Sequence, residues 1–231
     1  MPARPQPSAI DRTRYARDGF VLVEGLVEGT DVAALRAEAM RFDGGRGLGV
    51  HLQLVHRSAI VREFVTRGPP VAYATALIGP DVCFTHQQFV VKNPSTRPER
   101  TDVPWHQDNG YGRLEPPHDL TVWIALDDCT LDNGCLWVLP GSHTGGLRPH
   151  DDVGALRAVD VDERGVPVPM RAGDALLFGS LLLHRSLPNT TDRTRVGLYL
   201  RYCDPAVVMV NEGNKPVLDD AFSWMVAGEY R

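Results

Sequence analysis

The chain has 231 residues, of which 43% are hydrophobic, and its 24 basic and 29 acidic residues give a formal charge of −5. This length suits one large domain with a proper core. The basic residues are scattered singly, which argues against nucleic acid and against an anionic membrane as partners. A small-molecule partner is therefore expected, and nothing in the sequence indicates an oligomeric state.

Three further features of the sequence predict a cytoplasmic protein. The N-terminal segment MPARPQPSAI lacks the apolar core of a signal peptide. The most apolar run, 175–184, is short and interrupted by Gly179 and Ser180, so it predicts buried strands rather than a membrane span. The four cysteines show no CxxC pair, which favours reduced and mostly buried thiols.

The first third of the chain, residues 1–80, is expected to be mainly helical. A strand-like run covers 20–27, and the segment 30–42 opens on Thr30 and Asp31, residue types that cap helices, with apolar residues spaced by three and four. Glycine follows three of the helical segments, which is typical of helix ends. The four segments expected to form helices are 8–19, 30–42, 58–68 and 69–79.

From Val82 onward the sequence changes to short β-rich runs separated by Gly, Pro, Asn and Asp. These runs are 82–92, 119–128, 134–142, 173–180, 181–186 and 194–202. Helices followed by many antiparallel strands predict an α+β chain, mainly β, whose strands form a jelly roll or barrel. The N-terminal helices are expected to cover one face of the sheet.

A histidine and an aspartate are spaced for metal binding in the segment PWHQDNGYG. In an extended strand, alternate side chains share a face, so His106 and Asp108 point the same way. An imidazole nitrogen and a carboxylate oxygen on one face can occupy adjacent positions on a metal ion. The pair alone is also compatible with a hydrogen-bonded polar turn.

A second histidine, His184, ends the apolar run LLL and shares its strand face with Ser186. Such a histidine is compatible with a satisfied core position. Two histidines and one carboxylate with open positions are, however, the facial arrangement of non-haem Fe(II) oxygenases, whereas structural zinc sites are closed and tetrahedral.

An arginine on the next strand suggests an anionic ligand. Alternation along TRVGLYLRY places Arg195, Gly197, Tyr199 and Arg201 on one face. An inward-facing arginine is costly unless it meets an anion, and a dicarboxylate co-substrate held by the guanidinium fork would supply one, with Gly197 leaving room for it. A salt bridge at the barrel rim is the alternative for Arg195.

Four motifs together resemble the phytanoyl-CoA dioxygenase family of Fe(II)- and 2-oxoglutarate-dependent oxygenases. They are WHQD, DNGCLWVLPGSH, AGDALLFGSLLLHRSLPN and RTRVGLYLRY. The resemblance runs from about Val82 to Tyr202. It implies a double-stranded β-helix (jelly roll) core over 82–204 within a single domain of 231 residues, with Fe(II), 2-oxoglutarate and O₂ as cofactor and co-substrates.

The resemblance also implies roles for individual residues. Iron would be held by His106, Asp108 and His184. The arginine eleven residues after the distal histidine, 184 + 11 = 195, would bind the far carboxylate of 2-oxoglutarate, assisted by Ser186. Three further co-substrate contacts are implied: Trp123, Lys92 and Gln88. Trp123 is equally compatible with core packing. Lys92 and Gln88 share a strand face with His86, and a solvated edge strand is the alternative for this face.

The expected reaction is hydroxylation of an unactivated C–H bond in a small molecule, an amino acid or a natural-product intermediate, with release of succinate and CO₂. Because Asp108 is a carboxylate rather than Ala or Gly, hydroxylation is favoured over halogenation. Four residues are candidates for substrate contacts at the mouth of the pocket: His86, Tyr111, Trp137 and Arg201. Two other functions stay open, a cupin-like enzyme with non-redox metal chemistry and a non-catalytic small-molecule-binding jelly roll.

Overall fold

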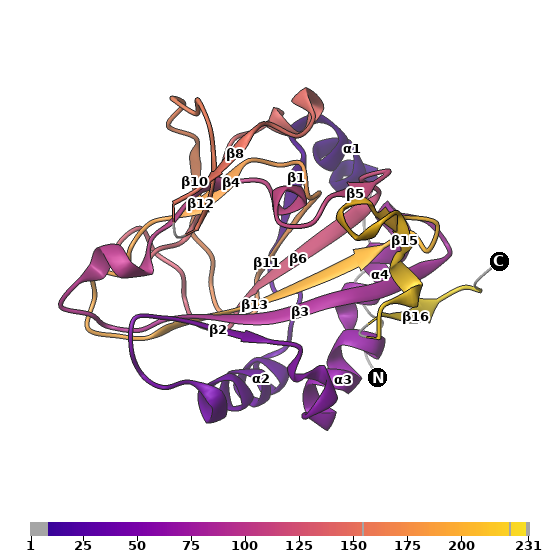
Figure 1. Ribbon diagram of the computed structural model, residues 1–231. Helices are drawn as coiled ribbons and strands as arrows, with labels where there is room; N and C mark the ends of the chain where they lie inside the picture. Colours follow the sequence, from indigo (N-terminus) through magenta and orange to yellow (C-terminus); the bar gives the residue numbers. More distant parts are fainter. Residues whose placement is uncertain (1–8, 154, 222, 230–231) are drawn as a thin grey trace.

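The computed structural model describes residues 9–153, 155–221 and 223–229. Two antiparallel sheets face one another, and helices cover the outer face of the larger sheet (Figure 1). The chain is therefore mainly β with the jelly-roll fold that the sequence predicts.

The larger sheet has seven strands in the order β1-β11-β6-β13-β3-β16, with β2 also paired to β3. Its long central strands are β3 (Val82–Lys92), β6 (Asp119–Ala125) and β13 (Arg195–Cys203). The others are β1 (Phe20–Val23), β2 (Leu48–Leu52), β11 (Ala175–Phe178) and β16 (Trp224–Ala227). Arg195 is the direct partner of Lys92 across the antiparallel pair of β13 and β3.

The smaller sheet has four strands in the order β10-β7-β12-β4. They are β4 (Val103–His106), β7 (Leu136–Val138), β10 (Val166–Val168) and β12 (His184–Ser186). A third sheet joins β5 (Leu114–Glu115), β14 (Val208–Met209) and β15 (Lys215–Pro216), and a hairpin joins β8 (His150–Asp152) to β9 (Leu156–Ala158).

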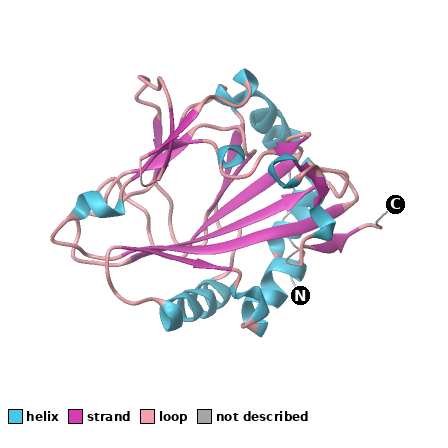
Figure 2. Cartoon of the chain, viewed as in Figure 1, coloured by secondary structure: helices cyan, strands magenta, loops and turns pink. Residues whose placement is uncertain are grey.

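Four helices occur in the N-terminal third, as predicted, and α2, α3 and α4 lie along the large sheet (Figure 2). They are α1 (Ala9–Asp18), α2 (Gly29–Phe42), α3 (Ala59–Arg67) and α4 (Pro69–Leu77). Ser58 caps α3 by accepting a hydrogen bond from the Val61 amide at 3.2 Å. The expected cap at Thr30 is wrong: α2 begins at Gly29, so Asp31 lies in its first turn, where a negative charge favours the helix dipole.

Alternation along β13 separates a helix-facing core from the barrel interior. Val196, Leu198 and Leu200 are fully buried in the core between the large sheet and the helices. The Tyr202 side chain extends through this core, and its hydroxyl donates a hydrogen bond to the Val65 carbonyl oxygen on α3 at 2.8 Å. The opposite face of the strand is therefore free to supply polar side chains to the interior.

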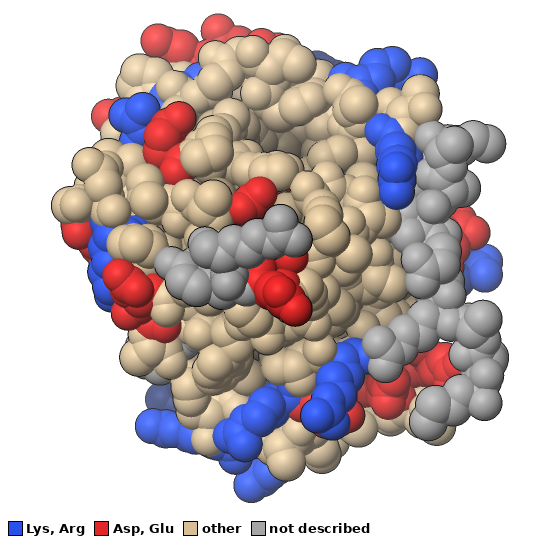
Figure 3. All heavy atoms as spheres, turned by 90° about the vertical axis from the view of Figure 1, so that its right-hand side faces the viewer, with Lys and Arg blue, Asp and Glu red and all other residues tan. Residues whose placement is uncertain are grey.

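The surface carries its charges in separate small groups. On the face shown in Figure 3, lysine and arginine side chains lie around the margin rather than in one basic patch. None of the described helices combines the length and the apolar character needed to cross a bilayer.

Candidate metal centre

Two strands of the smaller sheet bring the predicted histidines together. His106 is the last residue of β4, His184 is the first residue of β12, and the two are direct partners across the antiparallel pair. Their ring centroids lie 4.1 Å apart. Cross-strand pairing therefore makes neighbours of residues 78 positions apart (184 − 106) in the sequence.

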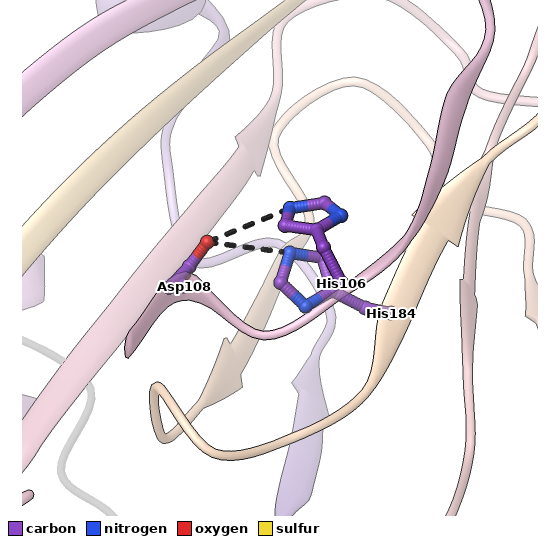
Figure 4. Close-up of side chains that lie close together, drawn as sticks. All are labelled: His106, Asp108 and His184. Atoms are coloured by element: carbon purple, nitrogen blue, oxygen red, sulfur yellow. Dashed lines mark ion pairs between the residues drawn. The ribbon is translucent and has the colours of Figure 1, made fainter. Parts of the chain in front are cut away.

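Asp108 completes the cluster from the turn that follows β4. Its Oδ1 lies 3.5 Å from Nε2 of His184 and 3.7 Å from Nε2 of His106, and all three side chains point toward one another (Figure 4). One ligand atom from each residue lies within 4.8 Å of the others, and all three residues are buried. The arrangement is the facial set of two imidazoles and one carboxylate that suits an open iron site.

Backbone carbonyl groups orient both imidazoles toward the same point. Nδ1 of His106 lies 2.8 Å from the Pro104 carbonyl oxygen, and Nδ1 of His184 lies 3.0 Å from that of Leu182. Because a carbonyl oxygen only accepts, each Nδ1 carries the proton. Each Nε2 therefore keeps its lone pair for a metal ion.

Electrostatics keep the cluster in the protonation states that metal binding needs. Burial and the neighbouring His184 lower the pKa of His106 to about 3, so this imidazole is neutral at neutral pH. Burial alone would raise the pKa of Asp108, but the two imidazoles and Arg201 hold it below its ordinary value. The site therefore presents the neutral imidazole of His106 beside the ionised carboxylate of Asp108.

The residue between the two ligands anchors the turn that carries them. Nε2 of Gln107 donates to the carbonyl oxygens of Gly146 at 2.8 Å and Leu181 at 2.7 Å, and its Oε1 accepts from the Arg148 amide at 2.7 Å. The side chain is fully buried with both amide atoms bonded. It joins the turn after β4 to the segment before His184.

Arg195 is a buried cation without an acidic partner. It is 1% exposed, and its Nη2 donates to the Gly134 carbonyl oxygen at 2.8 Å, whereas its Nε and Nη1 have no partner. No carboxylate of the described residues forms an ion pair with it. Burial accordingly lowers its pKa, and the two unpaired nitrogens are suited to an anionic ligand such as the distal carboxylate of 2-oxoglutarate.

The ring of Trp123 lies between the Arg195 region and the open interior. The guanidinium carbon lies 5.3 Å from the ring centre, within cation–π range. A Cβ atom at Gly197 would collide with this ring. The expectation that Gly197 leaves space for a ligand is therefore wrong, because Trp123 fills that space.

Lys92 is fully buried beside Arg195, on the neighbouring strand. Its Nζ donates to the carbonyl oxygens of Ser186 at 2.9 Å and Leu187 at 2.6 Å. Burial and the adjacent Arg195 charge lower its pKa to about 6. Lys92 thus holds the strand that carries His184 and does not line the cavity, which excludes the solvated-edge alternative.

A cavity of about 770 Å³ opens from the metal cluster between the two sheets. Six of the predicted contact residues line it together with the three cluster residues: His86, Gln88, Tyr111, Trp123, Ser186 and Arg201. Leu48, Val50 and Leu52 of β2 provide an apolar wall. Met209 and Val217 close the cavity from the C-terminal segment.

Trp137 does not line the cavity, although the sequence analysis expected it at the mouth of the pocket. Its ring centre is 5.2 Å from the guanidinium carbon of Arg185, which also lies 4.8 Å from the ring centre of Trp105. Trp137 therefore packs in an arginine–aromatic stack rather than facing the cavity.

Arg201 reaches the cavity as half of a buried ion pair. Its Nε donates to Oδ2 of Asp119 at 2.8 Å, and Oδ1 of Asp119 accepts from the Ser180 hydroxyl at 2.6 Å. Burial alone would lower the pKa of Arg201, but Asp119 raises it above the ordinary value. The guanidinium therefore stays charged beside the metal cluster.

A family model described as phytanoyl-CoA dioxygenase (PhyH) matches residues 50–197, the part of the chain that contains all three cluster residues and Arg195. The chain belongs to the phytanoyl-CoA dioxygenase family. Members of this family are oxygenases that depend on non-haem iron and 2-oxoglutarate, and the donor set described above fits both groups.

Curated relatives agree with this membership. The chain is 33% identical over 219 residues to the peroxisomal phytanoyl-CoA dioxygenase of Homo sapiens, an alignment that covers 80% of this chain and 64% of the human protein. It is 25% identical over 225 residues to the protein of Rattus norvegicus, covering 83% and 67%. The chain thus spans about two thirds of the length of these relatives.

Solved structures with the same fold include enzymes named for several reactions. The α-ketoglutarate-dependent epimerase SnoN from nogalamycin biosynthesis superposes with a TM-score of 0.73 at 25% identity, covering 92% of this chain and 87% of SnoN. The carbocyclase SnoK has a TM-score of 0.77 at 23% identity, covering 96% and 97%. EvdO2 from Micromonospora carbonacea var. aurantiaca has a TM-score of 0.75 at 23% identity, covering 88% and 94%.

Sequence reasoning did not single out Thr121 or Tyr199, which connect the metal cluster to the larger sheet. Thr121 donates to Oδ2 of Asp108 at 3.0 Å, and Tyr199 lines the cavity with its hydroxyl 3.4 Å from the Thr121 hydroxyl. Tyr199 lies on the inward face that alternation predicts. Nothing in the local sequence of Thr121 distinguishes it from an ordinary strand residue.

Proposed function

We propose that this enzyme hydroxylates an aliphatic C–H bond of a small molecule at an iron held by His106, Asp108 and His184. The observation that carries the proposal is the combination of this open facial set with Arg195, a buried guanidinium with two unpaired nitrogens. The facial set alone would suit several metal reactions. A dicarboxylate requirement explains why a buried cation without an acid is kept nearby.

The residues around Arg195 support a co-substrate site. Its fork would hold the distal carboxylate of 2-oxoglutarate. Ser186, Gln88 and Trp123 line the adjacent cavity and would supply a hydroxyl, an amide and an aromatic wall. Lys92 would act indirectly, because its Nζ holds the backbone of Ser186 and Leu187 in place beside this site.

The rest of the cavity would bind the substrate. Its apolar wall on β2 suits a carbon skeleton, while His86, Tyr111 and Arg201 add polar groups to the lining. The T-shaped contact of Tyr111 with the His106 ring, at 5.6 Å between centroids, places a substrate contact next to the metal cluster. An intermediate of natural-product biosynthesis fits a cavity of this size and mixed polarity.

The protein's own part in the reaction is to bind, orient and exclude water. When bound, iron and 2-oxoglutarate supply the oxidising chemistry, with succinate and CO₂ released as co-products. The imidazoles and Asp108 fix the metal, and Arg195 fixes the orientation of the co-substrate. The apolar lining keeps water away from the reacting C–H bond.

The whole chain is proposed to act as one domain in the cytoplasm. The C-terminal segment supports the first point, because it contributes Met209 and Val217 to the cavity and pairs β16 with β3. The four cysteines support the second point, because all are buried and none forms a disulfide.

An anaerobic titration with Fe(II) and 2-oxoglutarate tests the proposal directly. We expect a visible metal-to-ligand charge-transfer band that forms only when both are present, followed by O₂-dependent succinate release in a screen of small molecules. Metal-dependent turnover without O₂ or the keto acid would instead favour a cupin-like enzyme. Tight iron and 2-oxoglutarate binding without succinate release on any substrate would favour a non-catalytic binding protein.

A further inference from the structure

We propose that Thr121 acts as a positioning residue that keeps Asp108 a one-oxygen ligand, and that Tyr199 orients the Thr121 hydroxyl. The inference rests on the proposed assignment of His106, Asp108 and His184 as iron ligands. It concerns which coordination positions of the iron stay open.

The two oxygens of Asp108 have different surroundings. Oδ1 faces the metal position, 3.5 Å and 3.7 Å from the Nε2 atoms of His184 and His106. Oδ2 is bonded to the Thr121 hydroxyl at 3.0 Å. Since an ionised carboxylate only accepts hydrogen bonds, the Thr121 hydroxyl is the donor, and Oδ2 is engaged away from the metal.

The single hydroxyl proton of Thr121 then determines the next link. The Thr121 hydroxyl lies 3.0 Å from Oδ2 of Asp108 and 3.4 Å from the Tyr199 hydroxyl, and it is placed to donate toward either, so its one proton favours the shorter contact, to the carboxylate. Thr121 is fully buried, and Tyr199 is 7% exposed at the cavity wall. The contacts from Tyr199 to Thr121 and from Thr121 to Asp108 therefore connect the large sheet to the turn after β4.

These contacts come from strands with a fixed register. Thr121 lies on β6 directly opposite Arg201 of β13, and Tyr199 lies opposite Trp123. The two hydroxyl groups thus belong to adjacent strands of one sheet, whereas Asp108 belongs to the turn after β4 of the other sheet. Strand pairing gives the hydroxyl pair a rigid base, which a flexible loop would not provide.

The number of oxygens through which Asp108 binds would decide how many positions on the iron stay open. Three protein ligands leave three positions on a six-coordinate ion, two for the keto acid and one for O₂. A carboxylate can also bind a metal through both oxygens, and Asp108 would then occupy one of those positions. The hydrogen bond from Thr121 stabilises binding through one oxygen, because this bond must break before Oδ2 can rotate toward the metal.

The test compares Thr121→Val, which has nearly the same shape without the hydroxyl, with Thr121→Ser, which keeps the hydroxyl. Each protein is titrated anaerobically with Fe(II) alone by calorimetry, and the iron-loaded protein is then titrated with 2-oxoglutarate by means of the charge-transfer band. Thermal unfolding of the metal-free proteins measures any structural loss. For Thr121→Val we expect iron binding at least as tight as in the native protein and a dissociation constant for 2-oxoglutarate raised at least about tenfold.

Thr121→Ser is expected to keep the native 2-oxoglutarate affinity, and Tyr199→Phe to weaken it by about threefold. Unchanged 2-oxoglutarate affinity in Thr121→Val would overturn the inference. Equal weakening of iron and 2-oxoglutarate binding would also overturn it, because that pattern indicates simple disruption. If Thr121→Val does not fold, Tyr199→Phe decides by the same criteria. A native protein that binds neither ligand would instead refute the proposed function.

Discussion

The side-chain amide of Gln107 donates a hydrogen bond to the Leu181 carbonyl oxygen at 2.7 Å, three residues before His184. The same nitrogen bonds to Gly146 at 2.8 Å, so one side chain ties the segments that carry all three cluster residues. A buried amide that bonds through both atoms stabilises the fold and fixes geometry at once.

Removing this amide should weaken both stability and metal binding. Gln107→Met leaves two carbonyl oxygens and one amide without their partner, and we expect a loss of about 1–3 kcal/mol in the free energy of unfolding, together with weaker Fe(II) binding. Gln87→Met is a matched control, because Gln87 is also fully buried but both of its amide atoms lack partners. Urea unfolding should show Gln87→Met neutral or stabilising, and equal losses in both variants would contradict this reasoning.

Replacing the buried guanidinium of Arg195 should weaken co-substrate binding without destabilising the fold. Arg195→Met removes a cation that the fold itself does not neutralise, so the metal-free protein should be as stable as the native one or more stable. Affinity for 2-oxoglutarate should fall by about 100-fold or more, since a carboxylate loses its charged fork. The Arg195→Lys variant keeps the charge but not the fork, so its affinity for 2-oxoglutarate should lie between those of the native protein and Arg195→Met. Titration of the charge-transfer band measures these affinities, and native affinity in Arg195→Met would exclude Arg195 from the co-substrate site.

Lys92 should make the free energy of unfolding increase with pH above about pH 6. Its pKa is about 6 in the folded protein and 10.5 as the ordinary value. Between these values the unfolded chain binds a proton that the folded chain does not, so stability should rise with pH, by at most about 1.4 kcal/mol per unit.

The Lys92→Met variant should lose this slope between about pH 6 and pH 10. The second lysine of the chain, Lys215, provides the control, because it lies near the surface with Nζ 3.8 Å from Glu212. Lys215→Met should therefore keep the native slope. Denaturant unfolding at several pH values is the measurement, and a native slope in Lys92→Met would show that Lys92 stays protonated inside the fold.

Loss of the carboxylate ligand should abolish tight iron binding. Asp108→Ala leaves two imidazoles, and we expect affinity for Fe(II) to fall by about 100-fold or more and succinate release to stop. Asp151→Ala removes an exposed carboxylate that pairs with Arg157 at 3.5 Å, and it should behave like the native protein. Full hydroxylation by Asp108→Ala with unchanged iron affinity would show that the ligand assignment is wrong.

Much of the fold and the composition of the cluster could be predicted because the signals are local. Two-residue alternation puts His106 and Asp108 on one face, and the same rule assigns Tyr199 and Arg201 to the interior. Short β-rich runs after an N-terminal helical third predict a jelly roll or a barrel, and the family resemblance implies the jelly roll. These signals depend on neighbouring residues only.

Other parts of the site depend on pairing between distant strands, which a single sequence does not reveal. Thr121 is important because β6 brings it to Asp108. Trp137 faces away from the cavity because Arg185 packs against its ring. The C-terminal segment returns to the larger sheet, where β16 pairs with β3, and it contributes Met209 and Val217 to the cavity lining.

The contact between Gly197 and Trp123 limits how the pocket can be altered by engineering. No larger residue fits at position 197 without displacing the indole beside Arg195. The β2 wall is different, because Val50 and Leu52 line the cavity but are 46% and 54% exposed. Random libraries aimed at new substrates should therefore vary the β2 edge, where a changed side chain can extend into solvent, and leave the indole and its glycine untouched.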